Sequence, residues 1–104
     1  MIEPITTKLA GVTFGDCQDN IKEWGCIDTG TYAVVREHNN KHDSNAVKVS
    51  LYGMFTMGYL PRHIAAIMAP LMDAGRNFLA EFICRNEYAP YENVGLTVRI
   101  VETQ

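Results

Sequence analysis

A polar segment at residues 37–44 separates two apolar stretches and carries the side chains best suited to bind a ligand. It follows Arg36 directly and contains His38, His42 and Asp43. Imidazole and carboxylate groups ligate metals or transfer protons, and loops between strands often carry binding sites. The simpler interpretation is that the asparagines and aspartate of this segment only close a turn. Both interpretations fit the residue types.

A metal site is the first chemistry to test. His38 and His42 are four residues apart with Asp43 beside them, a spacing that converges on one ion when it lies in a helix. Here the spacing falls in a loop, and His63 lies beyond the following strand pair. We therefore expect no metal. A hydrolase using His38, His42 and Asp43 with a metal is the weakest alternative.

No other catalytic pattern is present in the sequence. It contains no G-x-S-x-G nucleophile motif and no glycine-rich loop that would hold a phosphate group. The sequence has three cysteines, which are Cys17, Cys26 and Cys84. Their odd number and the lack of C-x-x-C spacing argue against a disulfide framework and against a cysteine zinc site. We expect a protein that is not an enzyme and needs no cofactor.

The length and the net charge of the chain restrict its possible functions further. The 104 residues fit one domain, and the net charge is −3, whereas proteins that coat long nucleic acids are usually basic. No apolar run reaches membrane-spanning length, and the N-terminal residues do not have the pattern of a signal peptide. The expected compartment is the cytoplasm, and a nucleic-acid role would have to use a pocket for a few nucleotides.

Such a pocket needs aromatic rings that stack on bases and a few cations that contact phosphates. The aromatic candidates lie near predicted strand ends and loops, and they are Phe14, His42, Tyr59, Tyr88 and Tyr91. The nearby cations are Arg36, Lys41 and Arg62, and Arg62 lies at a predicted helix start, where backbone amides favour an anion.

Short apolar segments separated by turn residues predict the elements that would position these side chains. Strands are predicted at 5–14, 31–36, 45–51, 55–59, 78–83 and 94–102. Helices are predicted at 17–24, capped by Asp16, and from Pro61 to the stop signal at 73–75, with a kink or restart at Pro70.

The order β-α-β-β-β-α-β-β predicts a mainly β fold with two helices (α+β), a small six-stranded antiparallel barrel over residues 1–104. One core is expected, and its predicted members are Val12, Trp24, Val34, Val47, Val49, Leu60, Ile64, Ile67, Leu71, Phe82, Val98 and Ile100.

Four segments together resemble the HIRAN domain family, and the resemblance covers about residues 8–101. They are G-V-T-F at 11–14, V-V-R-E-x-x-N-x-x-D-x-N-A-V-K-V at 34–49, M-G-Y-L-P-R at 57–62 and A-P-L-M-D-A-G at 69–75. The resemblance implies an OB-like or SH3-like barrel and, from the eukaryotic members, binding of single-stranded DNA at its 3′ end.

The resemblance also implies a role for each matched residue. Asp43 matches the carboxylate that hydrogen-bonds the terminal 3′-hydroxyl, and Phe14 matches an aromatic residue that stacks on a base. His42 stands where the family usually has a tyrosine that packs on the terminal nucleotide. Tyr59 and Arg62 match positions near the phosphates. Tyr91, by a loose alignment, matches a loop aromatic.

The sequence departs from the family pattern at three matched positions. Thr13 replaces an arginine of the DNA-binding members, and His38 and Asn40 stand where proline is more common. The leading expectation is a module for the 3′-hydroxyl end of single-stranded DNA or a frayed duplex end, in repair, replication or recombination, with a separate repair or replication enzyme as a further partner. The alternative is a protein-interaction adaptor that kept the barrel and lost the DNA site.

Overall fold

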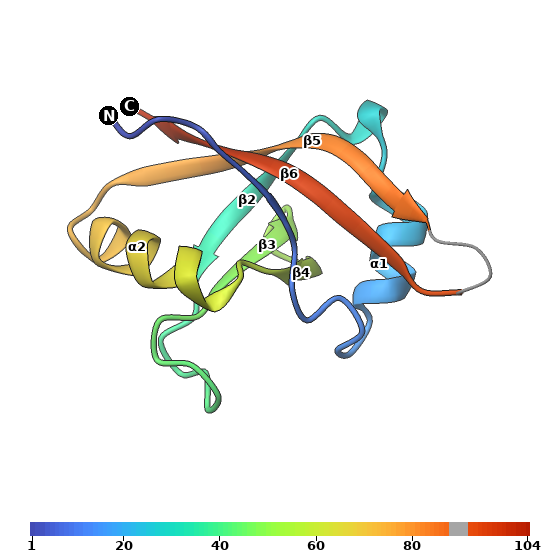
Figure 1. Cartoon of the computed structure of the whole chain (residues 1–104), viewed down its shortest axis with the longest axis horizontal. Helices are drawn as coiled ribbons and strands as arrows, with labels where there is room; N and C mark the ends of the chain where they lie inside the picture. The colour runs from blue at the N-terminus through green and yellow to red at the C-terminus, as the bar shows by residue number, and fades with distance from the viewer. Residues whose placement is uncertain (88–91) are drawn as a thin grey trace.

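Six strands and two helices follow one another in the predicted order in the computed structural model, which describes residues 1–87 and 92–104 (Figure 1). A short 3₁₀ segment, η1, is the one described element that the sequence did not predict. The elements are β1 (Ile5–Lys8), α1 (Cys17–Trp24), η1 (Ile27–Thr29), β2 (Thr31–Arg36), β3 (Val47–Leu51), β4 (Phe55–Tyr59), α2 (Arg62–Asp73), β5 (Asn77–Glu87) and β6 (Val94–Thr103).

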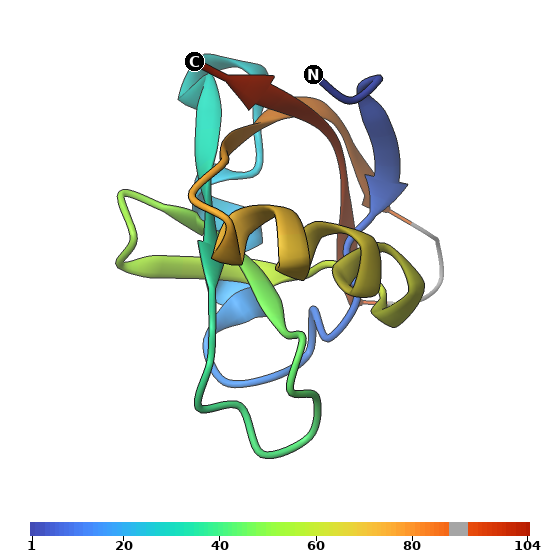
Figure 2. The same ribbon diagram turned by 90° about the vertical axis from the view of Figure 1, so that its left-hand side faces the viewer.

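The strands form one antiparallel sheet in the order β1-β6-β5-β2-β3-β4. The sheet curls so that its two edge strands approach each other, as Figure 2 shows. Just after β1, Ala10 donates a 2.7 Å backbone hydrogen bond to Tyr59 of β4 and accepts one of 2.8 Å from it. This bridge joins the two edges, and the predicted α+β fold with a six-stranded barrel-like sheet is confirmed.

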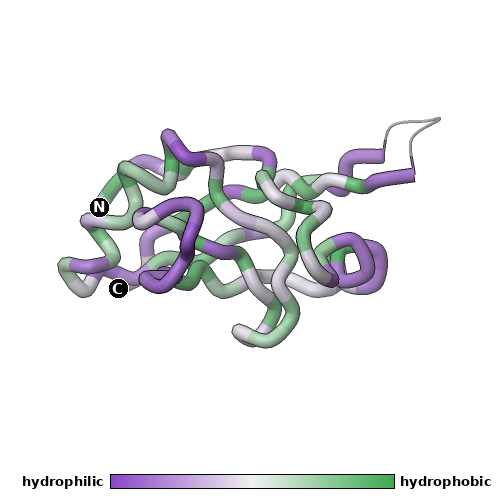
Figure 3. Tube along the Cα trace, turned by 90° about the horizontal axis from the view of Figure 1, so that it is seen from below, coloured by the Kyte–Doolittle hydropathy of each residue, from purple (hydrophilic) through white to green (hydrophobic). Residues whose placement is uncertain are grey.

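The core fills the inside of the curled sheet. Along β6, Val94, Leu96, Val98 and Ile100 are buried, and the residues between them are more exposed, as period-two alternation predicts. Figure 3 shows hydrophobic and hydrophilic stretches interleaved along the trace, a pattern that suits one shared core. The predicted core residues Val34, Val47, Val49, Leu60, Ile64, Val98 and Ile100 are all buried.

Five of the predicted core residues are not fully buried. Ile67 is 56% exposed, so its assignment to the core was wrong. The face of α2 that meets the sheet consists instead of Ile64, Ala65, Met68 and Ala69, and Ile67 lies off that stripe. The other four are partly buried and pack against the core, and they are Val12, Trp24, Leu71 and Phe82.

The two helices sit on different parts of the sheet. α1 packs against β4 and β6, and the Trp24 ring lies 4.2 Å from the Phe55 ring. α2 lies against β2 and β3 and passes through Pro70 as a single helix. Of the two predicted outcomes at Pro70, a kink or a restart, the restart does not occur. Pro70 lies in the last turn, where its missing N–H costs only the hydrogen bond to the carbonyl of the exposed residue Ala66.

The first strand is shorter than predicted. β1 ends at Lys8, and the chain then turns at Gly11 and Gly15, whose φ angles are +60° and +50°. These left-handed conformations stop a strand and suit glycine. Asp16 precedes α1 as predicted, but its side chain makes no capping hydrogen bond. The turn leaves Phe14 outside the sheet, 63% exposed.

Neither α1 nor α2 has the length and apolar character that crossing a lipid bilayer requires, and this holds for every helix in residues 1–87 and 92–104.

Candidate functional site

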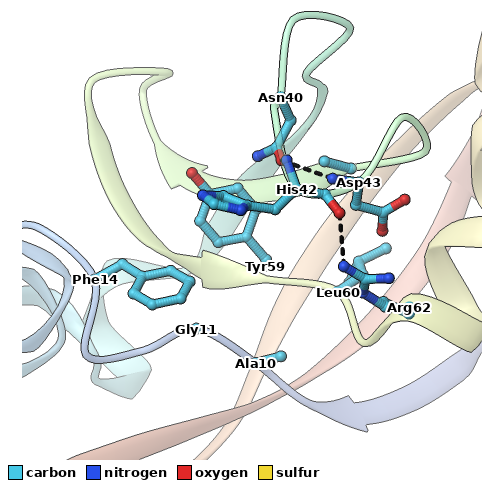
Figure 4. Close-up of a pocket in the computed structure, with 10 residues that line it drawn as sticks. Ala10, Gly11, Phe14, Asn40, His42, Asp43, Tyr59, Leu60 and Arg62 are labelled. Atoms are coloured by element: carbon cyan, nitrogen blue, oxygen red, sulfur yellow. Dashed lines mark hydrogen bonds between the residues drawn. The ribbon is translucent and has the colours of Figure 1, made fainter.

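A pocket of about 540 Å³ lies between the turn after β1, the polar loop at residues 37–46 and the start of α2 (Figure 4). Five predicted site residues, from three distant parts of the sequence, meet in it: Phe14, His42, Asp43, Tyr59 and Arg62. The other lining residues are Ala10, Gly11, Asn40, Ala46 and Leu60.

Asn40 holds the polar loop in shape. Its Oδ1 accepts hydrogen bonds from the backbone amides of His42 at 2.8 Å and Asp43 at 3.0 Å. Its Nδ2 donates to Oε1 of Glu37 at 2.8 Å. Asparagine side chains commonly bond to backbone amides a few residues ahead, and this turn chemistry places His42 and Asp43 at the pocket. Sequence reasoning placed Asn40 in the polar loop but did not predict these bonds.

Asp43 uses one oxygen for the loop and keeps the other available. Its Oδ1 accepts a 2.9 Å hydrogen bond from the backbone amide of Asn45, the bond that the simpler, turn-closing interpretation requires. Its Oδ2 makes no hydrogen bond to any residue of 1–87 or 92–104. Figure 4 shows the carboxylate on the same side of the loop as the Arg62 guanidinium. A half-buried carboxylate with a spare oxygen can accept a hydrogen bond from a ligand.

The aromatic wall consists of Phe14 and Tyr59, with Gly11 between them. A Cβ at Gly11 would lie 3.0 Å from the Phe14 ring and 3.2 Å from the Tyr59 ring, so a larger residue would push against both rings. The Tyr59 hydroxyl donates to Glu37 at 3.4 Å. Burial raises the pKa of the Tyr59 phenol, and the nearby Glu37 charge raises it further. The neutral ring is therefore maintained at the pocket.

The segment that carries Phe14 is tied to the rest of the domain by Gln18. Its Nε2 donates to the carbonyls of Val12 at 2.7 Å and Val94 at 2.9 Å, and its Oε1 accepts from the Val94 amide at 2.8 Å. Three hydrogen bonds from one side chain fix the turn after β1 against the start of β6. Nothing in the sequence pattern distinguished Gln18 from other polar residues of an amphipathic helix.

Arg62 supplies the positive charge of the pocket. It is the first residue of α2, and its Nη2 donates a 2.6 Å hydrogen bond to the backbone carbonyl of His42. The side chain is exposed, and it stands at a helix N-terminus, where free backbone amides also favour an anion. One end of the pocket therefore attracts negative charge.

Arg36 does not reach this pocket. Its guanidinium pairs with Asp73 of α2 at 3.2 Å and donates to the carbonyl of Ala46 at 3.2 Å, and the side chain is only 12% exposed. His38 bonds the same carboxylate at 3.0 Å, and His38 and Arg36 together lower the pKa of Asp73. Arg36 thus joins the loop to α2. Tyr88 and Tyr91 lie outside the described residues.

The two histidines of the loop point to different partners. His38 contacts Asp73, whereas His42 lines the pocket. Within residues 1–87 and 92–104, no three side chains of histidine, cysteine, aspartate or glutamate come together in a way that could hold a metal ion. The pocket instead combines aromatic rings, one guanidinium, one carboxylate with a spare oxygen, and an apolar lining of alanine and leucine.

The sequence matches the model of one protein family, and the overall fold is similar to solved structures. The model of the HIRAN domain family matches residues 25–102. The crystal structure of a protein from Lactobacillus plantarum is similar, with a TM-score of 0.71 and 19% identity over 97% of this chain and 98% of that chain. The crystal structure of the HIRAN domain of human HLTF is also similar, with a TM-score of 0.65 and 17% identity over 95% of this chain and 74% of that chain. No curated protein matches the sequence.

Proposed function

The chain belongs to the HIRAN domain family, and we propose that it is a non-enzymatic module that binds the 3′-hydroxyl end of single-stranded DNA or of a frayed duplex. The observation that carries this proposal is the spare carboxylate oxygen of Asp43 in the same pocket as Arg62 and two aromatic rings. This set of groups matches the parts of a terminal nucleotide.

Each part of a terminal nucleotide has a counterpart in the pocket. Phe14, Tyr59 and the His42 imidazole offer planar surfaces on which a base can stack. Arg62 and the amides at the start of α2 can contact the phosphate that links the last two nucleotides. Asp43 Oδ2 can then accept a hydrogen bond from the free 3′-hydroxyl.

The end group is the proposed specificity element. An ionised carboxylate accepts hydrogen bonds but cannot donate them, so it favours a hydroxyl over a phosphate in the same place. A 3′-phosphate would also bring like charge into contact with Asp43. Base identity at the last position contributes little in this scheme, because stacking tolerates every base. The role that follows is in repair, replication or recombination, alongside a separate repair or replication enzyme.

A protein-interaction adaptor is the alternative function, and three observations favour it. The net charge is −3, and Arg36, one of the predicted phosphate contacts, is occupied by Asp73 inside the domain. Thr13, which stands where DNA-binding relatives have arginine, adds no charge. An adaptor would keep the barrel and the loop network but would show no dependence on the end of a nucleic acid.

The test is a titration of the purified protein with fluorescently labelled oligonucleotides of one sequence that end in a 3′-hydroxyl or a 3′-phosphate. We expect the hydroxyl-ended strand to bind more tightly. The 5′ end, labelled identically in both strands, serves as the internal control. Equal affinity for both ends, or no binding to either, would favour the adaptor function instead.

A further inference from the structure

A second pocket, of about 220 Å³, adjoins the first on the side of α1 and the turn between β3 and β4. Phe14 and Tyr59 line both pockets, so the two pockets share these aromatic side chains. The remaining lining residues of the second pocket are Gly15, Asp16, Cys17, Asn20, Met54 and Thr56.

Asn20 is the polar group that distinguishes this pocket. It lies on α1 and is only 9% exposed. Its Nδ2 donates a 2.8 Å hydrogen bond to the backbone carbonyl of Thr56, and a carbonyl can only accept, so the nitrogen must face Thr56. Its Oδ1 makes no hydrogen bond within residues 1–87 and 92–104. A buried amide therefore presents an unpaired acceptor, and a second N–H, at the wall of a pocket.

The other lining residues of the second pocket determine which ligands it can bind. Met54 is 74% exposed and Phe14 is 63% exposed, so both present apolar surface to a ligand. The exposed carboxylate of Asp16 would repel a phosphate group there. A flat, uncharged ring that carries its own hydrogen-bond donor fits these walls, whereas an anion does not.

We propose that this second pocket binds the nucleobase next to the terminal one and that Asn20 hydrogen-bonds the edge of that base, as it can with adenine. This inference rests on the proposed function of the first pocket. An asparagine amide matches adenine because Oδ1 accepts from the N6 amino group while the remaining N–H donates to N7. Unsubstituted purine, which is adenine without its N6 amino group, keeps the ring and N7 but leaves Oδ1 of Asn20 without a donor.

The direct test uses 3′-hydroxyl strands that differ only in the nucleotide before the last, which carries adenine, unsubstituted purine or no base. We expect adenine to bind more tightly than unsubstituted purine by roughly 5- to 150-fold, because purine leaves the buried Oδ1 of Asn20 unpaired. The abasic strand should bind more weakly than the adenine strand by a similar factor, because it also loses stacking.

Two variants connect the effect to the pocket. Asn20→Ala should bring the adenine and unsubstituted purine strands to the same affinity. Because this change also leaves the Thr56 carbonyl without its partner, Met54→Ala is the second variant: Met54 is exposed and does not line the first pocket. It should weaken binding of the adenine strand and leave the abasic strand unchanged. Ile27→Ala, at a residue 73% exposed and outside both pockets, is the matched control.

The outcomes separate this inference from the proposed function. Equal affinity for adenine, unsubstituted purine and abasic strands, with the 3′-hydroxyl preference intact, would overturn the second pocket and leave the end-binding function standing. A base preference that persists without any end preference would keep the second pocket and overturn the end-binding function. Absence of binding to every strand would overturn both.

Discussion

The guanidinium of Arg62 and the backbone carbonyl of His42 are joined by a 2.6 Å hydrogen bond that links the first turn of α2 to the polar loop. The residue that supplies the positive charge of the pocket thus also positions the loop that carries Asp43. Charge and geometry at this site are therefore coupled through one side chain, and substitutions there test both.

Arg62→Ala should weaken binding to strands of every sequence by a similar factor, because a phosphate contact carries no base information. Arg62 and the helix start can neutralise about one or two phosphates, so log affinity should fall with log salt with a slope of about −0.7 to −1.4 on single strands. The variant should show a slope closer to zero. A slope several times steeper in the unmodified protein would indicate a basic track beyond this pocket.

The variants Asp43→Asn and Asp43→Ala distinguish the roles of the two carboxylate oxygens of Asp43. Asparagine can keep the Oδ1 bond to the Asn45 amide but loses the charge, whereas alanine loses both. We expect the unmodified protein to prefer the 3′-hydroxyl over the 3′-phosphate by roughly 1.5–3 kcal/mol, the scale of a charge-assisted hydrogen bond. Both variants should lose most of this preference in titrations with the two strands.

Melting temperatures complete the comparison of the two Asp43 variants. Asp43→Ala should be less stable than Asp43→Asn, because only alanine removes the bond to the Asn45 amide. If the variants lower stability but keep the full end preference, Asp43 serves only to close the turn and the 3′-hydroxyl contact lies elsewhere.

Arg36→Ala should affect stability and leave binding nearly unchanged, in contrast to Arg62→Ala. Its guanidinium is tied to Asp73 and the Ala46 carbonyl within the domain, and its side chain is 12% exposed. Loss of these bonds should cost roughly 1–2 kcal/mol of unfolding free energy, since Asp73 is partly exposed. Urea denaturation measures the change. If Arg36→Ala weakens binding as much as Arg62→Ala does, Arg36 contacts the ligand.

Gly11→Ala should lower both stability and binding. A φ of +60° costs a non-glycine residue roughly 1–2 kcal/mol, and the new Cβ would push against Phe14 and Tyr59. Gly75→Ala is the matched control, because Gly75 has a φ of +89° and open space around its Cβ position. The control should lose stability alone. Equal binding by the two variants would show that the aromatic wall tolerates displacement.

Glu102 should govern part of the acid stability. Hydrogen bonds from Arg76, at 2.6 and 2.7 Å, and then from the Ile2 amide lower the pKa of Glu102 from 4.5 to about 2. A carboxyl whose pKa is lower in the folded state stabilises it above pH 4.5, and this contribution disappears as the pH falls toward 2.

Glu102→Gln should therefore melt at a lower temperature than the unmodified protein above pH 4.5, and the gap should narrow between pH 4.5 and 2. Melting curves across this range measure it. A gap that stays constant with pH would mean that the carboxylate charge of Glu102 does not contribute to stability.

The local pattern of the sequence determined most elements of this domain. Alternating apolar residues and flanking turn residues located β2, β4 and α1 at their observed bounds, and the apolar stripe of α2 identified Ile64 as core. These properties depend on neighbours within a few residues, so they can be read from the chain directly. The HIRAN resemblance, confirmed by the family model, agreed with the six-stranded barrel that the element order predicts.

The tertiary structure alone decided how the polar groups are shared between folding and the pocket. Arg36 and Arg62 look alike in the sequence, but Arg36 meets Asp73 across the domain while Arg62 faces the pocket. Gln18 acts through Val94, a partner far along the chain that only the folded sheet brings next to it. A side chain's hydrogen-bond partners depend on which distant segments the fold brings within about 3 Å, and no local pattern encodes that distance.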